Sequence, residues 1–386
     1  MEITAPRHEA DLAEYARLAH RAFATELTDL EVLHTHGAVR LALDGQRVIG
    51  GVTALPVGQF FAGAALSSCC ISTVCVAVDQ RGRGVARRLL EHVTAEQRAA
   101  GAVISSLWTP SLGLYRRWGW ELAGSATTGQ LPIDAFAPPV RHGYRVADVT
   151  ESAEHPLQRS LARTWHGPVD RPAWWWTWKY PDTTTGPRLY EISDPDGRAR
   201  ALVGCSRTRT GPWGHELEIT DYWAGDPEAA GLANAFISDQ RSQAATVRFQ
   251  PGTQPLLAPH LWTTDQYTTS QQVWHPWMLK LLDPAGAIEQ RPWPEAATGH
   301  LDLRLLGPSG AEEHLSFDIA SGKATAVTGR NPRVTLPTGL FTSWYAGSAS
   351  TEHLLQWGEA DGVTEEDRQL LTAMSGSHHT WLPDLF

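Results

Sequence analysis

Lysine is scarce in this sequence of 386 residues, which contains only Lys179, Lys280 and Lys323. A nucleotide-binding P-loop ends in Gly-Lys followed by Ser or Thr. The stretch Val76–Leu90 (VAVDQRGRGVARRLL) combines two glycines with four arginines but contains no lysine, so it is not a P-loop. It also lacks the last glycine of a dinucleotide-binding GxGxxG pattern. Both common nucleotide motifs are therefore excluded.

Cysteine is rare as well. The four cysteines, Cys69, Cys70, Cys75 and Cys205, show neither metal-ligand spacing nor the pattern of an extracellular disulfide framework. Three of them lie in or near one expected strand, which favours reduced, buried side chains. The 16 histidines are scattered and form no HExxH motif. We expect no metal site.

Long apolar runs are absent. No segment approaches the roughly 20 apolar residues of a membrane helix, and the opening MEITAPRHEADLAEY is not a signal peptide. The net charge of −10 argues against a nucleic-acid partner, because nucleic acids bind broad basic faces. The length suggests roughly two or three domains. The sequence thus predicts a cytoplasmic protein that binds neither membranes nor nucleic acid.

Helix and strand signals alternate in the first third of the chain. Residues 9–24 place Tyr15 on the apolar face of a helix. The Asp44–Gly45 pair indicates a hairpin turn between two strands within residues 39–55. The elements expected next are a buried strand at 69–78, a helix at 84–101, a strand at 102–108 and a short helix within 112–120. This order predicts a mixed sheet with flanking helices.

The rest of the chain falls into two further parts. After two prolines within residues 134–140, strands at 199–208 and 215–224, a helix at 227–241 and a strand at 246–250 repeat the earlier order. This second copy lacks the arginines and the tight glycine pair. From about Asp283, we expect a small α+β domain. Its short alternating strands are expected at 301–307, 314–322, 324–329 and 333–337, and its helices at 338–347 and 365–374. We therefore divide the chain into 1–138, 139–283 and 284–386.

A strand, a glycine- and arginine-rich turn and a helix start form an arrangement that binds phosphate. The first turn of a helix offers free N–H groups and a partial positive charge. Gly82 and Gly84 let the backbone approach a ligand closely, and Arg83, Arg87 and Arg88 can add charge-assisted hydrogen bonds. The alternative is an ordinary solvated helix start.

The motif R-x-x-G-x-A at Arg81–Ala86 resembles the pyrophosphate-binding signature of the GNAT family of N-acetyltransferases. The segment Tyr115–Trp120 (YRRWGW) is similar to the Tyr-x-x-x-Gly-aromatic motif of that family. The whole chain further resembles one subfamily, the enhanced intracellular survival (Eis) acetyltransferases. Residues 275–288 and 336–347 are similar to its corresponding segments, and the chain ends on Phe386 as its best-known members end on phenylalanine.

This resemblance implies a fold of class α/β and α+β, with tandem GNAT domains followed by a sterol-carrier-protein-like α+β domain. Residues 1–138 would be the catalytic domain with the acetyl-CoA site, and 139–283 a GNAT-like domain without the cofactor motif. Residues 284–386 would supply the C-terminal carboxylate. Members of the subfamily assemble as hexamers, so a homohexamer is expected.

The resemblance also assigns roles to residues. Tyr115 would give a proton to the leaving thiolate, and the carboxylate of Phe386 would accept a proton from the amine. The family usually has Ser-Glu just before this tyrosine, where the present sequence has Pro110–Ser111, and Pro110 has no N–H to donate. The expected CoA-binding residues are Val74, Cys75, Val76, Gly82, Arg83, Gly84, Val85, Ala86, Arg87, Pro110 and Ser111.

The expected activity is acetyl transfer from acetyl-CoA to small-molecule amines, of an aminoglycoside- or polyamine-like kind, or to lysine side chains. One alternative is an acyltransferase of a natural-product pathway with another acyl donor or a dedicated acceptor. Another is a non-enzymatic lipid carrier. The tryptophan cluster Trp174–Trp178 either packs at the junction of the first two domains or walls an acceptor pocket that binds a cation or a planar ligand.

Overall fold

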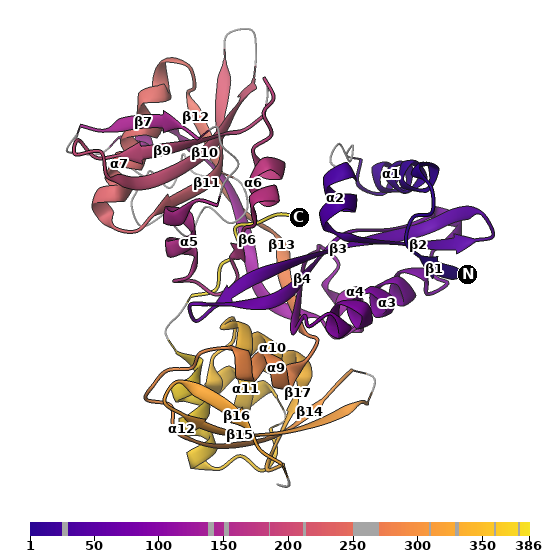
Figure 1. The fold of residues 1–386 in the computed structure, drawn as a ribbon. Helices are drawn as coiled ribbons and strands as arrows, with labels where there is room; N and C mark the ends of the chain where they lie inside the picture. Colours follow the sequence, from indigo (N-terminus) through magenta and orange to yellow (C-terminus); the bar gives the residue numbers. More distant parts are fainter. Residues whose placement is uncertain are drawn as a thin grey trace. The chain divides into compact units, whose positions relative to one another are not determined.

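The computed structural model of the protein describes residues 1–386 except 25–29, 138–142, 150–153, 185, 211–213, 250–269, 309, 329–331, 359 and 377–378. The chain divides into two compact units (Figure 1). The boundary that we placed at residue 138 lies outside the described residues. Unit 1 comprises Met1–Gly124, Pro276–Thr380 and Phe386, and unit 2 comprises Ser125–His275 and Trp381–Leu385.

The first sheet of unit 1 has the order β1-β2-β3-β4-β5-β13. Its neighbours are antiparallel except β4 and β5, which are parallel. The Asp44–Gly45 turn joins β2 to β3 as predicted, because Asp44 pairs with Arg47 and Gly45 has a φ of +62°. The strands are β1 (Glu2–Thr4), β2 (Ala38–Asp44), β3 (Arg47–Phe61), β4 (Ala64–Val76), β5 (Ile104–Trp108) and β13 (Ser270–Leu281).

Helices cover both faces of this sheet, with α1 and α2 on one face and α3 and α4 on the other (Figure 1). Two adjacent glycines of β3 face opposite ways. A Cβ on Gly50 would lie 3.1 Å from Val85 of α3, whereas a Cβ on Gly51 would lie 2.5 Å from the ring of Tyr15 of α1. Tyr15, on the predicted apolar face, is fully buried. The helices are α1 (Glu9–Phe23), α2 (Leu30–His36), α3 (Val85–Ala99) and α4 (Leu112–Arg116).

A second sheet of unit 1 has the order β16-β15-β14-β17. These are the four strands that we predicted after Asp283, and α10 and α12 are the two predicted helices. The helices α9 and α11 were not predicted. The elements are α9 (Pro284–Gln290), β14 (Gly299–Leu306), β15 (Glu312–Ala320), β16 (Lys323–Ala326), β17 (Val334–Pro337), α10 (Thr338–Ala346), α11 (Thr351–Trp357) and α12 (Glu365–Ser375).

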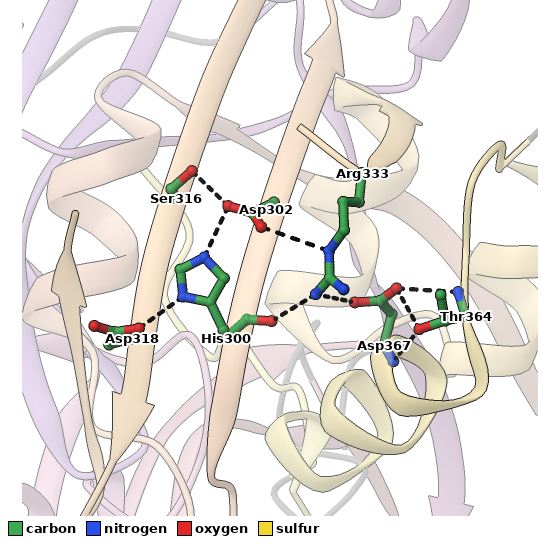
Figure 2. Close-up of polar contacts among 7 residues, drawn as sticks. All are labelled: His300, Asp302, Ser316, Asp318, Arg333, Thr364 and Asp367. Carbon is green, nitrogen blue, oxygen red and sulfur yellow. Dashed lines mark hydrogen bonds and ion pairs between the residues drawn. The ribbon is translucent and has the colours of Figure 1, made fainter. Parts of the chain in front are cut away.

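A polar network joins β14, β15 and α12 (Figure 2). Asp302 is 3% exposed, so its carboxylate needs partners. Its Oδ1 lies 2.9 Å from His300 Nε2 and accepts a hydrogen bond from Ser316 Oγ at 2.7 Å. Arg333 bridges the sheet to α12, because its Nη2 donates to Asp367 Oδ1 at 3.2 Å. The network satisfies two buried carboxylates and ties the helix to the sheet.

Unit 2 contains a sheet of the order β6-β12-β11-β10-β9-β7, in which only β11 and β12 are parallel. The predicted strand-strand-helix-strand succession is present as β10, β11, α7 and β12. The elements are β6 (Glu121–Pro132), β7 (Arg145–Asp148), α5 (Pro156–Ala162), β8 (Val169–Asp170), α6 (Ala173–Lys179), β9 (Arg188–Ser193), β10 (Ala199–Arg209), β11 (His215–Ala224), α7 (Pro227–Ser238) and β12 (Thr246–Phe249).

In unit 2, helix α7 occupies the place in the element order that α3 has in unit 1. A side chain caps the N-terminus of α7. Asp226 caps α7, with its carboxylate accepting a hydrogen bond from Ala229 N at 2.8 Å. A carboxylate in this position occupies the N–H groups that an anion would need and repels a second negative charge. The start of α7 is therefore a poor site for an anion.

The predicted fold class, mixed sheets with flanking helices and a smaller α+β part, is confirmed. All four cysteines are buried thiols that form no disulfide among the described residues, as expected. Within the described ranges, no group of three or more His, Cys, Asp or Glu side chains is placed to hold a metal ion. Among the same residues, no helix has both the length and the apolarity needed to cross a bilayer.

Candidate active site

Strand β4 separates from β5 part-way along unit 1. It pairs with β5 only from Ser68 to Ile71, whereas it pairs with β3 as far as Val76. Beyond Ile71, therefore, β4 is hydrogen-bonded along one edge and lines a cavity along the other. The N–H and C=O groups of such a strand edge can form hydrogen bonds with an extended ligand, in the same way as with a neighbouring strand.

A bulge interrupts the pairing of β4 with β3 at this point. Ser72 pairs with Thr53 and Cys75 pairs with Gly51, so two residues of β4 lie opposite one of β3. Thr73, inside the bulge, has a φ of +52°. This is the left-handed region, which non-glycine residues rarely occupy.

The turn before α3 presents the start of that helix to the same cavity. Gly82 and Gly84 have φ values of +78° and +75°, and a Cβ added to either would meet no atom of the described residues within 4 Å. Gly84 is the N-cap residue of α3, and the first turn of the helix contains no acidic side chain. The free N–H groups of this turn are therefore accessible to a phosphate group.

The cavity has a volume of about 830 Å³. It lies between the diverging strands and the start of α3, and α4 and the C-terminal residue close it. Twelve of the thirteen predicted site residues line it, and these are Val74, Cys75, Val76, Gly82, Gly84, Val85, Ala86, Arg87, Pro110, Ser111, Tyr115 and Phe386. The predicted residues, which span the sequence from strand β4 to the C-terminus, thus surround one cavity.

Arg83 is the predicted residue that does not line the cavity. Its Nη1 donates to Gln80 Oε1 at 3.4 Å, and its backbone oxygen accepts from Arg88 Nη2 at 3.4 Å. Arg87 lines the cavity while its Nε donates to Glu91 at 2.7 Å. Arg81, the first residue of the motif, also lines the cavity.

Tyr115 lies on the short helix α4 and is packed between two indoles. Its ring meets those of Trp118 and Trp120 edge to face, with centroid distances of 5.6 Å and 6.0 Å. Burial raises the pKa of the Tyr115 phenol to about 12. The phenol therefore keeps its proton at neutral pH, which is the state that a proton donor needs.

Cys75 also lines the cavity, but it is not a nucleophile. Burial, partly offset by a hydrogen bond with the backbone of Gly51, raises the pKa of its thiol to about 12. Because only the thiolate attacks efficiently, this residue contributes its backbone and its shape rather than covalent chemistry.

Most of the last residues of the chain are buried. Trp381, Leu382 and Asp384 are each 4% exposed or less. Trp381 packs against Trp165 and Trp223 at centroid distances of 5.2 Å and 4.8 Å within unit 2. The chain then ends at Phe386, which lines the cavity of unit 1.

A buried ionic cluster in unit 2 holds this segment. Arg171 forms two hydrogen bonds with Asp221 and one with Asp384, each of 2.8 Å, and Lys179 Nζ lies 3.2 Å from Asp221. Burial opposes ionisation of Asp221, but the charges of Arg171 and Lys179 outweigh it and hold its pKa well below its usual range. The cluster was not predicted, since its members are far apart in the sequence.

The tryptophan cluster forms helix α6 of unit 2. Trp175 and Trp176 are 1% and 3% exposed, and Arg171 lies over the ring of Trp176 at 4.7 Å. Trp174 and Trp178 are half-buried beside them. Trp175 and Trp176 belong to the core of unit 2, and whether the other two rings wall an acceptor pocket stays a prediction.

Several cavity residues were missed in the sequence. The paired glycines Gly50–Gly51 were a usable signal, because glycine inside a strand marks a close approach of another element. Here that element includes Tyr15, whose hydroxyl reaches the backbone of the bulge. Apart from Arg81, the cavity residues that we did not predict are Ala22, Phe23, Ile71, Ser72, Thr73, Gln80, Leu107, Trp108, Thr109, Leu114, Arg117 and Trp118.

The sequence of residues 5–123 matches the family described as the acetyltransferase (GNAT) domain. This part of the chain is a GNAT acetyltransferase domain. The prediction of an acetyltransferase is thereby confirmed for this domain. No curated protein sequence matches the chain significantly.

Solved structures resemble the entire chain, beyond the GNAT domain. A GCN5-related N-acetyltransferase from Anabaena variabilis is 23% identical with a TM-score of 0.85, and each chain is covered over 100%. One from Kribbella flavida is 20% identical with a TM-score of 0.82, covering 100% of this chain and 98% of that one. Eis1 from Mycobacterium abscessus is 17% identical with a TM-score of 0.79, and 100% of both chains is covered. At these identities the similarity concerns the fold.

Proposed function

We propose that the protein transfers an acetyl group from acetyl-CoA to a primary amine. The proposal rests on one observation above all: the free edge of β4, the glycine turn, Tyr115 and Phe386 line a single cavity of about 830 Å³. The free edge of β4 and the glycine turn at 82–84 suit a ligand with an extended thiol arm and a pyrophosphate. The other two are the proton donor and acceptor that acyl transfer to an amine requires.

In the proposed reaction the substrate binds in an extended form. Its pyrophosphate accepts hydrogen bonds from the N–H groups at Gly82–Arg87, and Arg81 and Arg87 add positive charge. Its pantetheine arm lies along Val74–Val76. The thioester oxygen then meets N–H groups of the bulge, where β4 has left β5 and the backbone is not used by the sheet.

The chemical step forms a C–N bond and breaks the C–S bond. The amine gives one proton to the carboxylate of Phe386 and attacks the thioester carbon. When the tetrahedral intermediate collapses, the C–S bond breaks and the protonated Tyr115 phenol donates first a hydrogen bond and then its proton to the departing sulfur of CoA. The tyrosinate recovers its proton from solvent, directly or through the carboxylate.

The finer features that we predicted are part of this proposal. They comprise membership of the Eis subfamily, the division at 138 and 283, the sterol-carrier-like character of residues 284–386, the hexamer and the cytoplasmic location. The fold similarity to Eis1 of Mycobacterium abscessus supports the first of them. The helix start capped by Asp226 supports the view that residues 139–283 have no phosphate site.

A second candidate function is transfer to one dedicated acceptor that carries a single amine, with acetyl-CoA or a longer acyl-CoA as donor. It is favoured by the lining of the cavity, because none of the described residues that line it is Asp or Glu. A polyamine or aminoglycoside carries several positive charges, which a site normally pairs with several carboxylates. Apart from the terminal carboxylate, the described lining carries no negative charge, and its charged side chains are Arg81, Arg87 and Arg117.

One assay tests the proposal and separates the candidates. The protein is incubated with acetyl-CoA or with longer acyl-CoA donors and a panel of mono- and polyamines, and the released thiol is followed. Release with acetyl-CoA and any amine supports the main proposal, and faster release with a longer donor or with monoamines alone supports the second. If no pair releases thiol, both fail and a non-enzymatic carrier becomes the better interpretation.

A further inference from the structure

The bulge of β4 depends on a residue in an unfavourable conformation. Thr73 has a φ of +52° although it is β-branched. Left-handed backbone at such a residue is sterically unfavourable and persists only where neighbouring groups hold it. Thr73 lines the cavity beside Val74, so whatever holds it also shapes the site.

Two side chains hold Thr73: Ser72 Oγ lies 3.0 Å from its Oγ1, and Tyr15 binds its backbone. The Tyr15 hydroxyl lies 2.8 Å from the backbone oxygen of Thr73 and 3.0 Å from Thr53 Oγ1. A carbonyl oxygen only accepts, so the single phenolic proton is donated to Thr73, and Thr53 donates its own proton to the phenol oxygen. The tyrosine is fully buried, and a Cβ on Gly51 would lie 2.5 Å from its ring.

This hydrogen bond fixes the direction of the next N–H group. In a trans peptide the C=O of one residue and the N–H of the next point in opposite directions. Since the Thr73 carbonyl is directed at Tyr15 on α1, the N–H of Val74 is directed away from it. Within the described strands, Val74 is paired with neither β3 nor β5, and it lines the cavity.

We propose that Tyr15 is a positioning residue for catalysis: it holds the Thr73–Val74 peptide so that the Val74 N–H faces the thioester oxygen. This inference rests on the proposed function and deepens it. Tyr15 does not touch the substrate. It acts by keeping the donor in place before negative charge develops on the oxygen, which is when a preorganised donor contributes most.

Tyr15→Phe tests this role, because it removes the hydroxyl and keeps the buried ring. Outright loss of one such donor lowers kcat by about 10²–10³. Loss of its support should cost less, so we expect kcat to fall about tenfold to hundredfold. The dissociation constant of acetyl-CoA, measured by calorimetry, should change less than about twofold, since the pyrophosphate turn is untouched. A kcat equal to that of the wild type would overturn the inference.

Thr53→Val is the matched control. It removes the other hydrogen bond of the Tyr15 hydroxyl from the same buried place but leaves the bond to Thr73. We expect kcat within about threefold of the wild type, because the donor to Thr73 remains. If this variant loses as much kcat as Tyr15→Phe, the loss reflects disturbed packing and the positioning role is wrong.

Thr73→Gly should rescue the Tyr15→Phe variant. Glycine adopts positive φ without the steric cost that threonine pays, so the bulge no longer needs the tyrosine bond. The double variant should regain at least about fivefold in kcat over Tyr15→Phe alone. If Tyr15→Phe does not fold, Thr73→Gly is compared with the double variant, and equal kcat values are expected. A drop of tenfold or more between these two folded variants would contradict the account.

Assays of the wild-type protein distinguish a failure of the proposed function from a failure of the positioning role of Tyr15. If it releases thiol from no acyl-CoA with any amine, the proposed function fails and Tyr15 has no catalytic step to support. If it turns over and Tyr15→Phe is equally active, only the positioning role fails. Thermal melting of each variant confirms that the kinetic values belong to folded protein.

Discussion

The guanidinium of Arg171 and the carboxylate of Asp384 meet at 2.8 Å, although 213 residues separate them in the chain. Both side chains are completely inaccessible to solvent. A buried pair of this kind contributes through the penalty for breaking it, because the partner that remains is an uncompensated charge. Water cannot reach either partner to compensate for a broken pair. The Arg171–Asp384 interaction therefore holds the C-terminal segment of unit 2 in place.

Replacing Arg171 should destabilise unit 2 severely. Arg171→Leu leaves Asp221 and Asp384 buried without their main partner, and we expect a loss of about 3–5 kcal/mol in the free energy of unfolding. Guanidinium unfolding followed by tryptophan fluorescence measures it. Arg159→Leu is the control, because Arg159 is half exposed and pairs with Asp170 at the surface, where a pair is worth at most about 1 kcal/mol. Equal losses in both variants would contradict the importance of burial.

Displacing the terminal carboxylate should abolish most of the activity. Adding one glycine after Phe386 moves the proposed proton acceptor away from the amine, and we expect kcat to fall by about 10²-fold or more. Binding of acetyl-CoA, measured by calorimetry, should persist. A glycine added before Met1, which is 44% exposed, is the control and should change neither quantity. An unchanged kcat in the C-terminal variant removes Phe386 from the mechanism.

Tyr115→Phe should lower kcat by about 10²–10⁴ while leaving acetyl-CoA binding intact. The pKa of Tyr115 is raised to about 12, so the phenol is protonated at every lower pH. Its donor form is therefore fully present at neutral pH and is lost only as the pH rises through about 12. The pH profile of wild-type kcat should show no decline from this group between pH 7 and about 10. A fall with a midpoint near 10, the ordinary tyrosine value, would show that the donor is another group or is not buried.

Two glycines at opposite ends of α3 offer a matched pair of variants. Gly84 and Gly101 both have positive φ, of +75° and +98°, and both have open space where a Cβ would lie. Alanine at either position should cost about 1–2 kcal/mol of stability through backbone strain. Only Gly84→Ala should also weaken acetyl-CoA binding, about tenfold by calorimetry or about 1.4 kcal/mol, because the added Cβ would hinder the approach of the pyrophosphate to the backbone. Equal affinities in the two variants would place the phosphates elsewhere.

Much of the site could be predicted because its signals are local. The Asp44–Gly45 hairpin and the glycine turn at 82–84 are set by neighbouring residues, and the structure contains both. The cavity also collects the residues that the motif and the Tyr115 segment indicated. Arg83 shows the limit of such a motif, because the sequence places this residue in the turn but does not determine the direction of its side chain.

Features that depend on distant contacts could not be predicted. The return of the chain at Trp277–Leu281 to pair with β5 has no local signature. The bond from Tyr15 to Thr73 spans 58 residues, and the amphipathic pattern of α1 showed only that Tyr15 is buried. A helical pattern identifies the buried face, but which backbone atom a buried hydroxyl reaches is decided by tertiary packing.

Because all four cysteines are buried, the folded protein itself should add little background signal to the assay of released thiol. Cys69, Cys75 and Cys205 have pKa values raised to about 12 by burial, so they carry almost no thiolate at assay pH. Disulfide reagents react with thiolates, and the folded protein should therefore leave such a reagent colourless until CoA is released. A rapid signal from the protein alone would instead report the fraction that has unfolded.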